Sequence, residues 1–266
     1  NFYFQISQIN KTAMLKNIKK EIKERKNYLK GEEVKSIYFG GGTPSILTTS
    51  EIKSLIKPIY KFYVVNKDAE ITIECNPDDI TDTKLSSYKK MGVNRLSIGI
   101  QSFDDADLKF MNRSHHAKSA IKSVQMAKKN GFKNIAIDLI YGLPKQTLKK
   151  WEKNLDIMFG LGIQHFSAYS LTIEKNTVLY HLIKNKTVNL ISDKKTIDQF
   201  NLLQRKAKEH EFIHYEISNF AKQGYEAKHN SSYWTDEKYL GLGPSAHSFD
   251  GKRRIWNVSN NIRYIN

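Results

Sequence analysis

The chain has 266 residues, of which 39% are hydrophobic, so it is long enough to bury the core of one large α/β domain. No run of about 18 apolar residues occurs, which excludes a typical membrane-spanning helix. The formal net charge is +16, but the lysines and arginines are spread over every predicted helix, so we attribute the charge to composition, expect no nucleic-acid partner and leave a membrane surface open as a partner.

Cys75 is the only cysteine of the chain. A single cysteine excludes an intrachain disulfide and is typical of a reducing compartment, which favours a cytoplasmic location. It also excludes an iron–sulfur cluster or a thiolate zinc site held by this chain alone. The start of the chain, Asn1–Gln5, lacks the basic and apolar regions of a signal peptide and lacks an initiator Met. We therefore expect an internal fragment or a trimmed chain.

The first part of the chain predicts a helix and a buried strand. Apolar residues recur at helical spacing over 11–30, and Gly31 is expected to end that helix. The apolar run Ile37–Phe39 predicts a strand that leads directly into Gly40–Gly42. Three glycines at the end of a strand indicate either a tight turn or a place where the backbone approaches a ligand closely.

Two further helices and a strand are predicted before residue 92. Thr48 and Glu51 have the spacing of a capping box, which predicts a helix from about residue 50 to 63. Apolar and charged residues alternate over Glu70–Glu74, which is typical of a strand. A helix is expected over 82–91, capped by its first residue.

A unit made of a helix end, a glycine and a strand then repeats three times. The predicted strands are Arg95–Ile100, Asn134–Leu139 and His165–Tyr169, which follow Gly92, Gly131 and Gly162. The repeats are roughly 30–40 residues apart, the length of one βα unit. With the two earlier strands they predict a five-stranded parallel sheet with right-handed crossovers.

Polar residues stand at the C-terminal ends of all five predicted strands, among them Thr43, Glu74, Gln101, Asp138 and Ser170. In a barrel these ends meet at one mouth, where active sites lie. This pattern favours a whole or partial barrel over an open doubly wound sheet.

The pattern changes after Leu171. An amphipathic helix is expected over 193–209, capped by Ser192 and with Ile197 on its apolar face, followed by a strand over Tyr215–Phe220. The segment that follows is rich in aromatic residues, glycine and histidine. No low-complexity linker separates it from the rest, so we expect an extension packed on the barrel.

Six motifs in this order resemble those of the radical S-adenosylmethionine (SAM) proteins. They are Tyr38–Pro44, Glu74–Pro77, Gly99–Phe103, Asn112–Arg113, Asp138–Pro144 and His229–Trp234. Within that family the chain is similar to the branch that contains the oxygen-independent coproporphyrinogen III oxidases and the HemW-type heme chaperones. The resemblance covers nearly the whole chain.

The resemblance implies an α/β fold, a partial (β/α)6 TIM-like barrel over residues 1–180 that lacks its first strand and cluster loop. It also implies a C-terminal α+β extension over 181–266, itself truncated, because members of the family continue with a further helical domain. SAM would bind at the mouth of the barrel.

The resemblance assigns SAM contacts to Gly41, Gly42, Thr43, Glu74, Gln101, Arg113, Asp138 and Ser170. Glu74 suits the cationic amino group of SAM, whereas Arg113 suits its carboxylate or its ribose edge. Gln101 can accept from ribose hydroxyls. The alternative for Arg113 is a surface ion pair with Asp104 or Asp107.

The [4Fe–4S] cluster of the family is held by three cysteines in a C-x3-C-x2-C loop, which this chain lacks. Asn1–Phe4 resembles the sequence just downstream of the third cysteine, so we expect the cluster cysteines upstream of Asn1. The chain itself holds no metal ligand set that we identify, and Cys75 is expected to be a small buried residue.

The motif His229-Asn230-x-x-Tyr233-Trp234 distinguishes the chaperone branch and has been linked to heme. Histidine is a suitable axial ligand of iron, and Tyr233 and Trp234 can line a porphyrin face. The alternative is a His229 that hydrogen-bonds a loop and a Trp234 in the core. His115, His116 and His247 have no spacing typical of metal ligands.

The resemblance implies a heme chaperone that binds heme and hands it to an apo-hemoprotein, with SAM and a [4Fe–4S] cluster in the intact form. The alternative is an enzyme, the oxygen-independent coproporphyrinogen III oxidase, which decarboxylates two propionates. Both functions involve a porphyrin that carries carboxylates. A third alternative is a protein without a cluster that only binds ligands.

Overall fold

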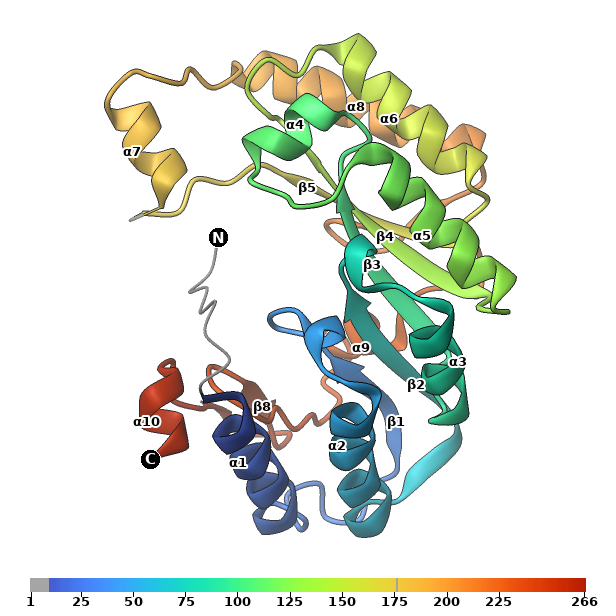
Figure 1. Cartoon of the computed structure of the whole chain (residues 1–266), viewed down its shortest axis with the longest axis vertical. Coiled ribbons are helices and arrows are strands. Elements are labelled where there is room, and N and C mark those ends of the chain that lie inside the picture. Colours follow the sequence, from blue (N-terminus) through green and yellow to red (C-terminus); the bar gives the residue numbers. More distant parts are fainter. Residues whose placement is uncertain (1–9, 176) are drawn as a thin grey trace.

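The computed structural model describes residues 10–175 and 177–266. Its centre is a curved parallel sheet whose strands are β1 (Val34–Phe39), β2 (Val65–Cys75), β3 (Arg95–Gln101), β4 (Asn134–Tyr141) and β5 (His165–Ser170). These five strands pair in sequence order and run parallel (Figure 1). The prediction of a parallel α/β sheet curled into a partial barrel is confirmed. The prediction made for Asn1–Phe4 lies outside the described residues.

Two short strands extend the sheet beyond β5. They are β6 (Ile213–His214) and β7 (Asn219–Ala221), and β7 pairs antiparallel with both β5 and β6. The predicted strand over Tyr215–Phe220 is therefore wrong, because the chain reverses direction within it. The Glu216 carboxylate accepts the Ser218 N–H at 3.1 Å, which stabilises the turn.

α-Helices precede, connect and follow the five parallel strands. They are α1 (Lys11–Glu24), α2 (Thr49–Phe62), α3 (Asp82–Lys90), α4 (Asp105–Phe110), α5 (Ala117–Lys129), α6 (Leu148–Gly160), α7 (Val178–Lys184) and α8 (Asp193–Glu209). Figure 1 shows α2, α3, α5, α6 and α8 on the convex side of the curve. These five helices therefore do not cover the concave side of the sheet (Figure 1).

Two of the three predicted helix caps are confirmed. Thr48 and Glu51 form the capping box of α2, and the Ser192 hydroxyl caps α8. The cap of α3 is Thr81 and not Asp82, because the Thr81 side chain accepts the Lys84 N–H at 3.2 Å. Asp82 is instead the first helical residue, where its charge favours the helix dipole.

The first helix is shorter than predicted. It ends at Glu24, and the next residues form turns in which Tyr28 N–H bonds the Arg25 carbonyl at 2.9 Å. Gly31 has φ +80° and ends these turns rather than the helix. The helical spacing of apolar residues continues through the turns, which is why the sequence did not separate them.

The last elements pack back onto the start of the chain. They are α9 (Lys228–Ser232), the hairpin of β8 (His247–Phe249) and β9 (Arg254–Trp256), and α10 (Asn261–Ile265). Tyr264 on α10 donates a hydrogen bond of 2.6 Å to Glu21 on α1. The boundary that we propose near residue 180 lies inside α7.

The core lies between the sheet and the outer helices. Phe166 on β5 and Phe220 on β7 are stacked with ring centroids 4.7 Å apart, and Trp151 on α6 is fully buried beside them in the same core. On α8, Leu203 is fully buried, whereas Ile197 is 56% exposed. The prediction that Ile197 faces the core is wrong, because the buried face of α8 carries Gln199, Leu202, Leu203 and Ala207 instead.

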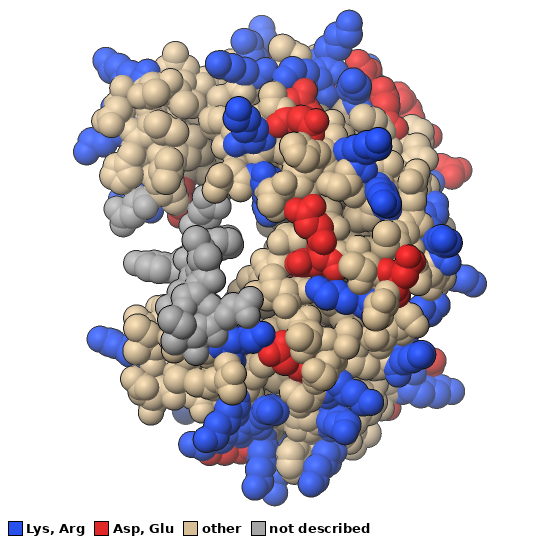
Figure 2. All heavy atoms as spheres, in the orientation of Figure 1, with Lys and Arg blue, Asp and Glu red and all other residues tan. Residues whose placement is uncertain are grey.

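The face of the molecule in Figure 2 has no single charged patch. Lys and Arg side chains are spread over the visible face in Figure 2 and do not gather in one patch. Among residues 10–175 and 177–266, no helix is long and apolar enough to cross a membrane.

Two substitutions on α8 test this packing. We expect Leu203→Ala to lower the free energy of unfolding by about 2–5 kcal/mol, because it removes a fully buried side chain and leaves a cavity. Ile197→Ala on the same helix should change it by less than about 0.5 kcal/mol, since that side chain is exposed. Urea unfolding followed by circular dichroism measures both. Equal losses in the two variants would contradict this placement of α8.

Candidate functional site

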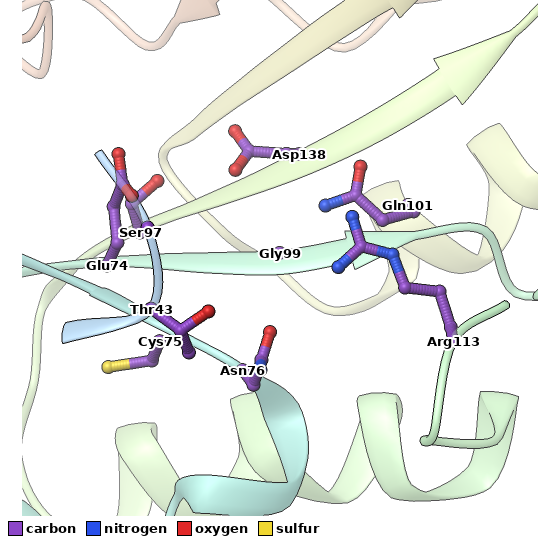
Figure 3. Close-up of a pocket in the computed structure, with 10 residues that line it drawn as sticks. Thr43, Glu74, Cys75, Asn76, Ser97, Gly99, Gln101, Arg113 and Asp138 are labelled. Atoms are coloured by element: carbon purple, nitrogen blue, oxygen red, sulfur yellow. The ribbon is translucent and has the colours of Figure 1, made fainter. Parts of the chain in front are cut away.

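A cavity of about 130 Å³ lies at the C-terminal ends of β1 to β4. It is lined by Gly42, Thr43, Glu74, Cys75, Asn76, Ser97, Gly99, Gln101, Arg113 and Asp138. Parallel pairing brings together the residues from β1 to β4 and from the turns after them, and Arg113 comes from the loop between α4 and α5. Figure 3 shows Glu74 and Arg113 on opposite sides of the cavity, with Asp138 between them.

Six of the eight residues that the sequence analysis assigned to a ligand line this cavity. They are Gly42, Thr43, Glu74, Gln101, Arg113 and Asp138. Gly41 does not line it, but it is adjacent in the chain to the lining residue Gly42. Ser170 does not line it: this residue is exposed at the end of β5, and its hydroxyl lies against Gly142.

Glu74 is held by the turn that follows β1. The Tyr38 hydroxyl donates to Glu74 Oε1 at 2.8 Å. A Cβ at Gly40 would lie 2.6 Å from that oxygen, so only glycine fits there, while Gly41 adopts φ +79°. Burial raises the pKa of Glu74, and repulsion by Asp138 adds to the effect, although the Tyr38 hydrogen bond opposes it. The carboxylate is thus placed where a cation would stabilise its charge.

Gln101 is presented by an irregular end of β3. The register between β3 and β4 shifts between Ile98 and Gln101, and Gln101 has φ +69°. A bulge of this kind re-aims a side chain, and a positive φ in a residue other than glycine is concentrated at functional sites. A Cβ at Gly99 would lie 2.9 Å from Gln101 Nε2. The glycine therefore makes room for the amide.

Asp138 and Arg113 complete the charged lining. Burial raises the pKa of Asp138, while the positive charges of Arg95 and Arg113 oppose this effect. The alternative for Arg113, an ion pair with Asp104 or Asp107, is wrong. The Asp104 carboxylate pairs with Lys150 at 3.2 Å.

Asp107 is occupied in another way. Its buried carboxylate accepts hydrogen bonds of 3.2 Å from Ser102 and from Gln146. Arg113 is therefore left facing the cavity.

Four lining residues were not assigned from the sequence. Ser97 and Gly99 alternate with Gln101 along β3, and Asn76 is two residues after Glu74, so the period of a strand was a signal for these three. Cys75 is buried, as expected, and burial raises the pKa of its thiol to about 12.

A second cluster surrounds His229 on α9. Its imidazole is stacked on the Tyr38 ring with centroids 4.3 Å apart and planes inclined by 16°, and its Nε2 lies 3.2 Å from the Tyr233 hydroxyl. Burial, assisted by the charge of Arg95, lowers the pKa of His229 to about 4. The imidazole is therefore neutral at physiological pH.

The rest of the motif from His229 to Trp234 is partly exposed to solvent. Trp234 is 62% exposed, so the alternative that places it in the core is wrong. Asn230 follows His229 on α9. His115 is buried with Nε2 2.9 Å from the Ile100 carbonyl, and within the described ranges no group of three His, Cys, Asp or Glu side chains is arranged to hold a metal.

Comparison with known proteins identifies the family. Residues 10–158, more than half of the chain, match the family model described as the radical SAM superfamily. The chain belongs to the radical SAM superfamily. Its cavity lies at the C-terminal strand ends, where barrels carry their sites.

Among radical SAM relatives, the chain is similar to proteins named heme chaperone HemW. It is 39% identical over 234 residues to the one from Bacillus subtilis (strain 168), covering 88% of this chain and 62% of that protein. It is 36% identical to that of Buchnera aphidicola subsp. Schizaphis graminum, covering 92% of this chain and 64% of that protein. The chain thus spans a little under two thirds of these relatives.

A solved structure, coproporphyrinogen III oxidase (HemN) from Escherichia coli, superposes with a TM-score of 0.83 at 24% identity. The match covers 98% of this chain and 63% of that one. At this identity it shows that the two chains share the radical SAM fold.

Replacement of Glu74 tests the electrostatics of the cavity. Because the folded-state pKa of Glu74 is raised, the folded chain binds more protons there than the unfolded chain, and the stability that Glu74 contributes falls as pH rises above about 4.5. We expect Glu74→Gln to have a Tm about 2–4 °C above that of the wild type at pH 7.5. The difference should shrink towards pH 4.5.

Differential scanning calorimetry across this pH range measures the effect. Glu209→Gln, a change of the same kind at a largely exposed side chain on α8, is the control and should leave the Tm unchanged. A Tm difference for Glu74→Gln that does not vary with pH would contradict a raised pKa.

Proposed function

We propose that this chain acts as a heme chaperone built on a radical SAM barrel: it binds heme and passes it to an apo-hemoprotein in the cytoplasm. The observation that carries the proposal is the similarity to the HemW proteins over most of the chain. The His229 cluster supports it, because it offers a neutral imidazole stacked on Tyr38, which contacts the lining residue Glu74, and an exposed tryptophan. The single cysteine supports the reducing location.

We propose SAM as the ligand of the cavity. Glu74 would hold its ammonium group, Arg113 its carboxylate, and Asp138 its ribose hydroxyls. The donor set fits such a ligand, since two carboxyl groups with raised pKa values face a guanidinium across a small cavity. Gly42 and Thr43 would offer backbone groups to the methionine moiety, with Gln101 beside the ribose. When bound to a reduced [4Fe–4S] cluster, SAM supplies radical chemistry.

The residues of this chain do not fit the cluster itself. A [4Fe–4S] cluster needs several thiolates, whereas Cys75 is alone and its thiol is neutral. What the chain's own residues do in this proposal is to bind and orient SAM and to offer His229 to heme iron.

The alternative function, decarboxylation of coproporphyrinogen III, has the weaker support. The likeness to the E. coli oxidase is a likeness of fold, whereas the sequence similarity is to proteins named as chaperones. The motif around His229 favours the chaperone, since its histidine can ligate iron, and coproporphyrinogen contains no iron. The two functions differ in what the protein does to a porphyrin: a chaperone returns it unchanged.

Substitutions in the cavity test SAM binding. We expect Arg113→Gln and Glu74→Gln each to weaken SAM binding at least tenfold, because each removes the charge that would face one end of the methionine moiety. Arg205→Gln, on the exposed face of α8, is the matched control and should bind as the wild type does. Isothermal titration calorimetry with SAM under anaerobic conditions measures the affinities. Wild-type affinity for SAM in both cavity variants would contradict the assignment of SAM to the cavity.

Heme titration tests the chaperone. We expect the wild type to bind hemin stoichiometrically with a Soret shift, and His229→Ala to bind it at least tenfold more weakly because the axial ligand is lost. His247→Ala, an exposed histidine on β8, should have no effect. Transfer of the bound heme to apomyoglobin is the second readout. Unchanged affinity in His229→Ala, or decarboxylation of coproporphyrinogen III by the same preparation, would argue against the proposal.

A further inference from the structure

Tyr38 is the one described side chain for which contacts with both Glu74 and His229 are observed. Its hydroxyl donates to Glu74 Oε1 at 2.8 Å, and its ring is stacked on His229 at 4.3 Å. It lies on β1, and the motif that contains His229 lies about 190 residues later in the chain. Tyr38 on β1 therefore contacts both the cavity, through Glu74, and the His229 cluster.

The contact on the cavity side is well defined. Burial, together with the negative charge of Glu74, raises the pKa of Tyr38, so the phenol stays protonated and always donates. A Cβ at Gly40 would lie 2.4 Å from the Tyr38 ring and 2.6 Å from Glu74 Oε1. The glycine is what permits the ring and the carboxylate to meet.

The contact on the cluster side is anchored independently. The Glu70 carboxylate accepts the backbone N–H groups of Lys228 and His229, each at 3.3 Å. Glu70 is itself buried and lies 3.9 Å from the guanidinium of buried Arg95. Since α9 is tied to β2 in this way, a change in the Tyr38 ring acts on an imidazole whose backbone is fixed.

We propose that Tyr38 couples the two sites, so that a cationic ligand at Glu74 strengthens metal ligation by His229, and ligation at His229 strengthens binding of the cation. A cation beside Glu74 keeps the carboxylate ionised, and the ionised carboxylate is the stronger acceptor for the Tyr38 hydroxyl. The ring is then held in the orientation in which it stacks on His229. By linkage the effect is reciprocal. The heme part of this inference rests on the proposed function.

Heme affinity with and without SAM tests the coupling. We expect saturating SAM to tighten hemin binding to the wild type by about fivefold or more, the low end of typical coupling between two sites. Tyr38→Phe keeps the ring and removes the hydroxyl, so its hemin affinity should change less than twofold on addition of SAM. Tyr63→Phe is the matched control, because it removes a hydroxyl that donates to the Ile22 carbonyl at 3.1 Å, outside the cavity. Equal effects of SAM on the wild type and on Tyr38→Phe would overturn the proposal.

A second measurement separates this inference from the proposed function. In protein labelled with ¹⁵N-histidine, we expect SAM to shift the ring nitrogens of His229 in the wild type and in Tyr63→Phe, but not in Tyr38→Phe. This readout requires no heme. If hemin does not bind while the shift occurs, the chaperone proposal fails and the coupling stands. If SAM binds without a shift, or does not bind, the coupling fails.

Discussion

Parallel pairing of five neighbouring strands is the constraint on which the rest of the structure depends. It forces each connection to cross the outer face as a helix, and it places the C-terminal ends of all five strands at one edge. The residues that follow the strands are not part of the regular hydrogen-bond ladder of the sheet. The turn after β1 and the bulge at the end of β3 use this freedom to present Glu74 and Gln101 to a common cavity.

The cavity contains buried carboxyl groups whose burial without a positive charge would lower the stability of the fold. Two carboxyl groups, Glu74 and Asp138, are removed from water close enough to repel each other. Such an arrangement lowers stability unless a positive charge enters, which is why perturbed carboxyl groups in a cavity indicate a ligand site. Arg113 supplies part of that charge. A ligand with both an ammonium and a carboxylate group would satisfy both sides.

The His229 cluster is separate from the cavity, but it is attached to the same sheet. Glu70 and Arg95 form a buried pair in the sheet, and the carboxylate reaches the backbone of α9. Removing either partner would leave a buried charge, so the pair ties the late segment to the barrel. His229 therefore rests on Tyr38 with little freedom. The proximity of the two sites depends on the sheet and on the attachment of α9 to it.

Much of the fold followed from the sequence, because local signals agreed with it. The apolar runs set the five strands, the glycines after the helices adopt φ above 0° at Gly92 and Gly131, and Thr48 with Glu51 began a helix as expected. Predictions failed where a local sequence pattern is compatible with two different structures. An alternating run over 215–220 suits one strand or a tight hairpin, and only pairing with β5 selects the hairpin.

The sequence by itself determined the family motifs, the parallel topology and six of the residues that line the cavity, since each depends on residue type and spacing along the chain. The tertiary structure decided which of these residues meet. Ser170 shares the strand-end position of the others, yet it faces Gly142 outside the cavity. The stacking of Tyr38 on His229 joins residues about 190 positions apart. Spacing carries no information about such a contact, because the curvature of the sheet and the docking of α9 bring the two rings together.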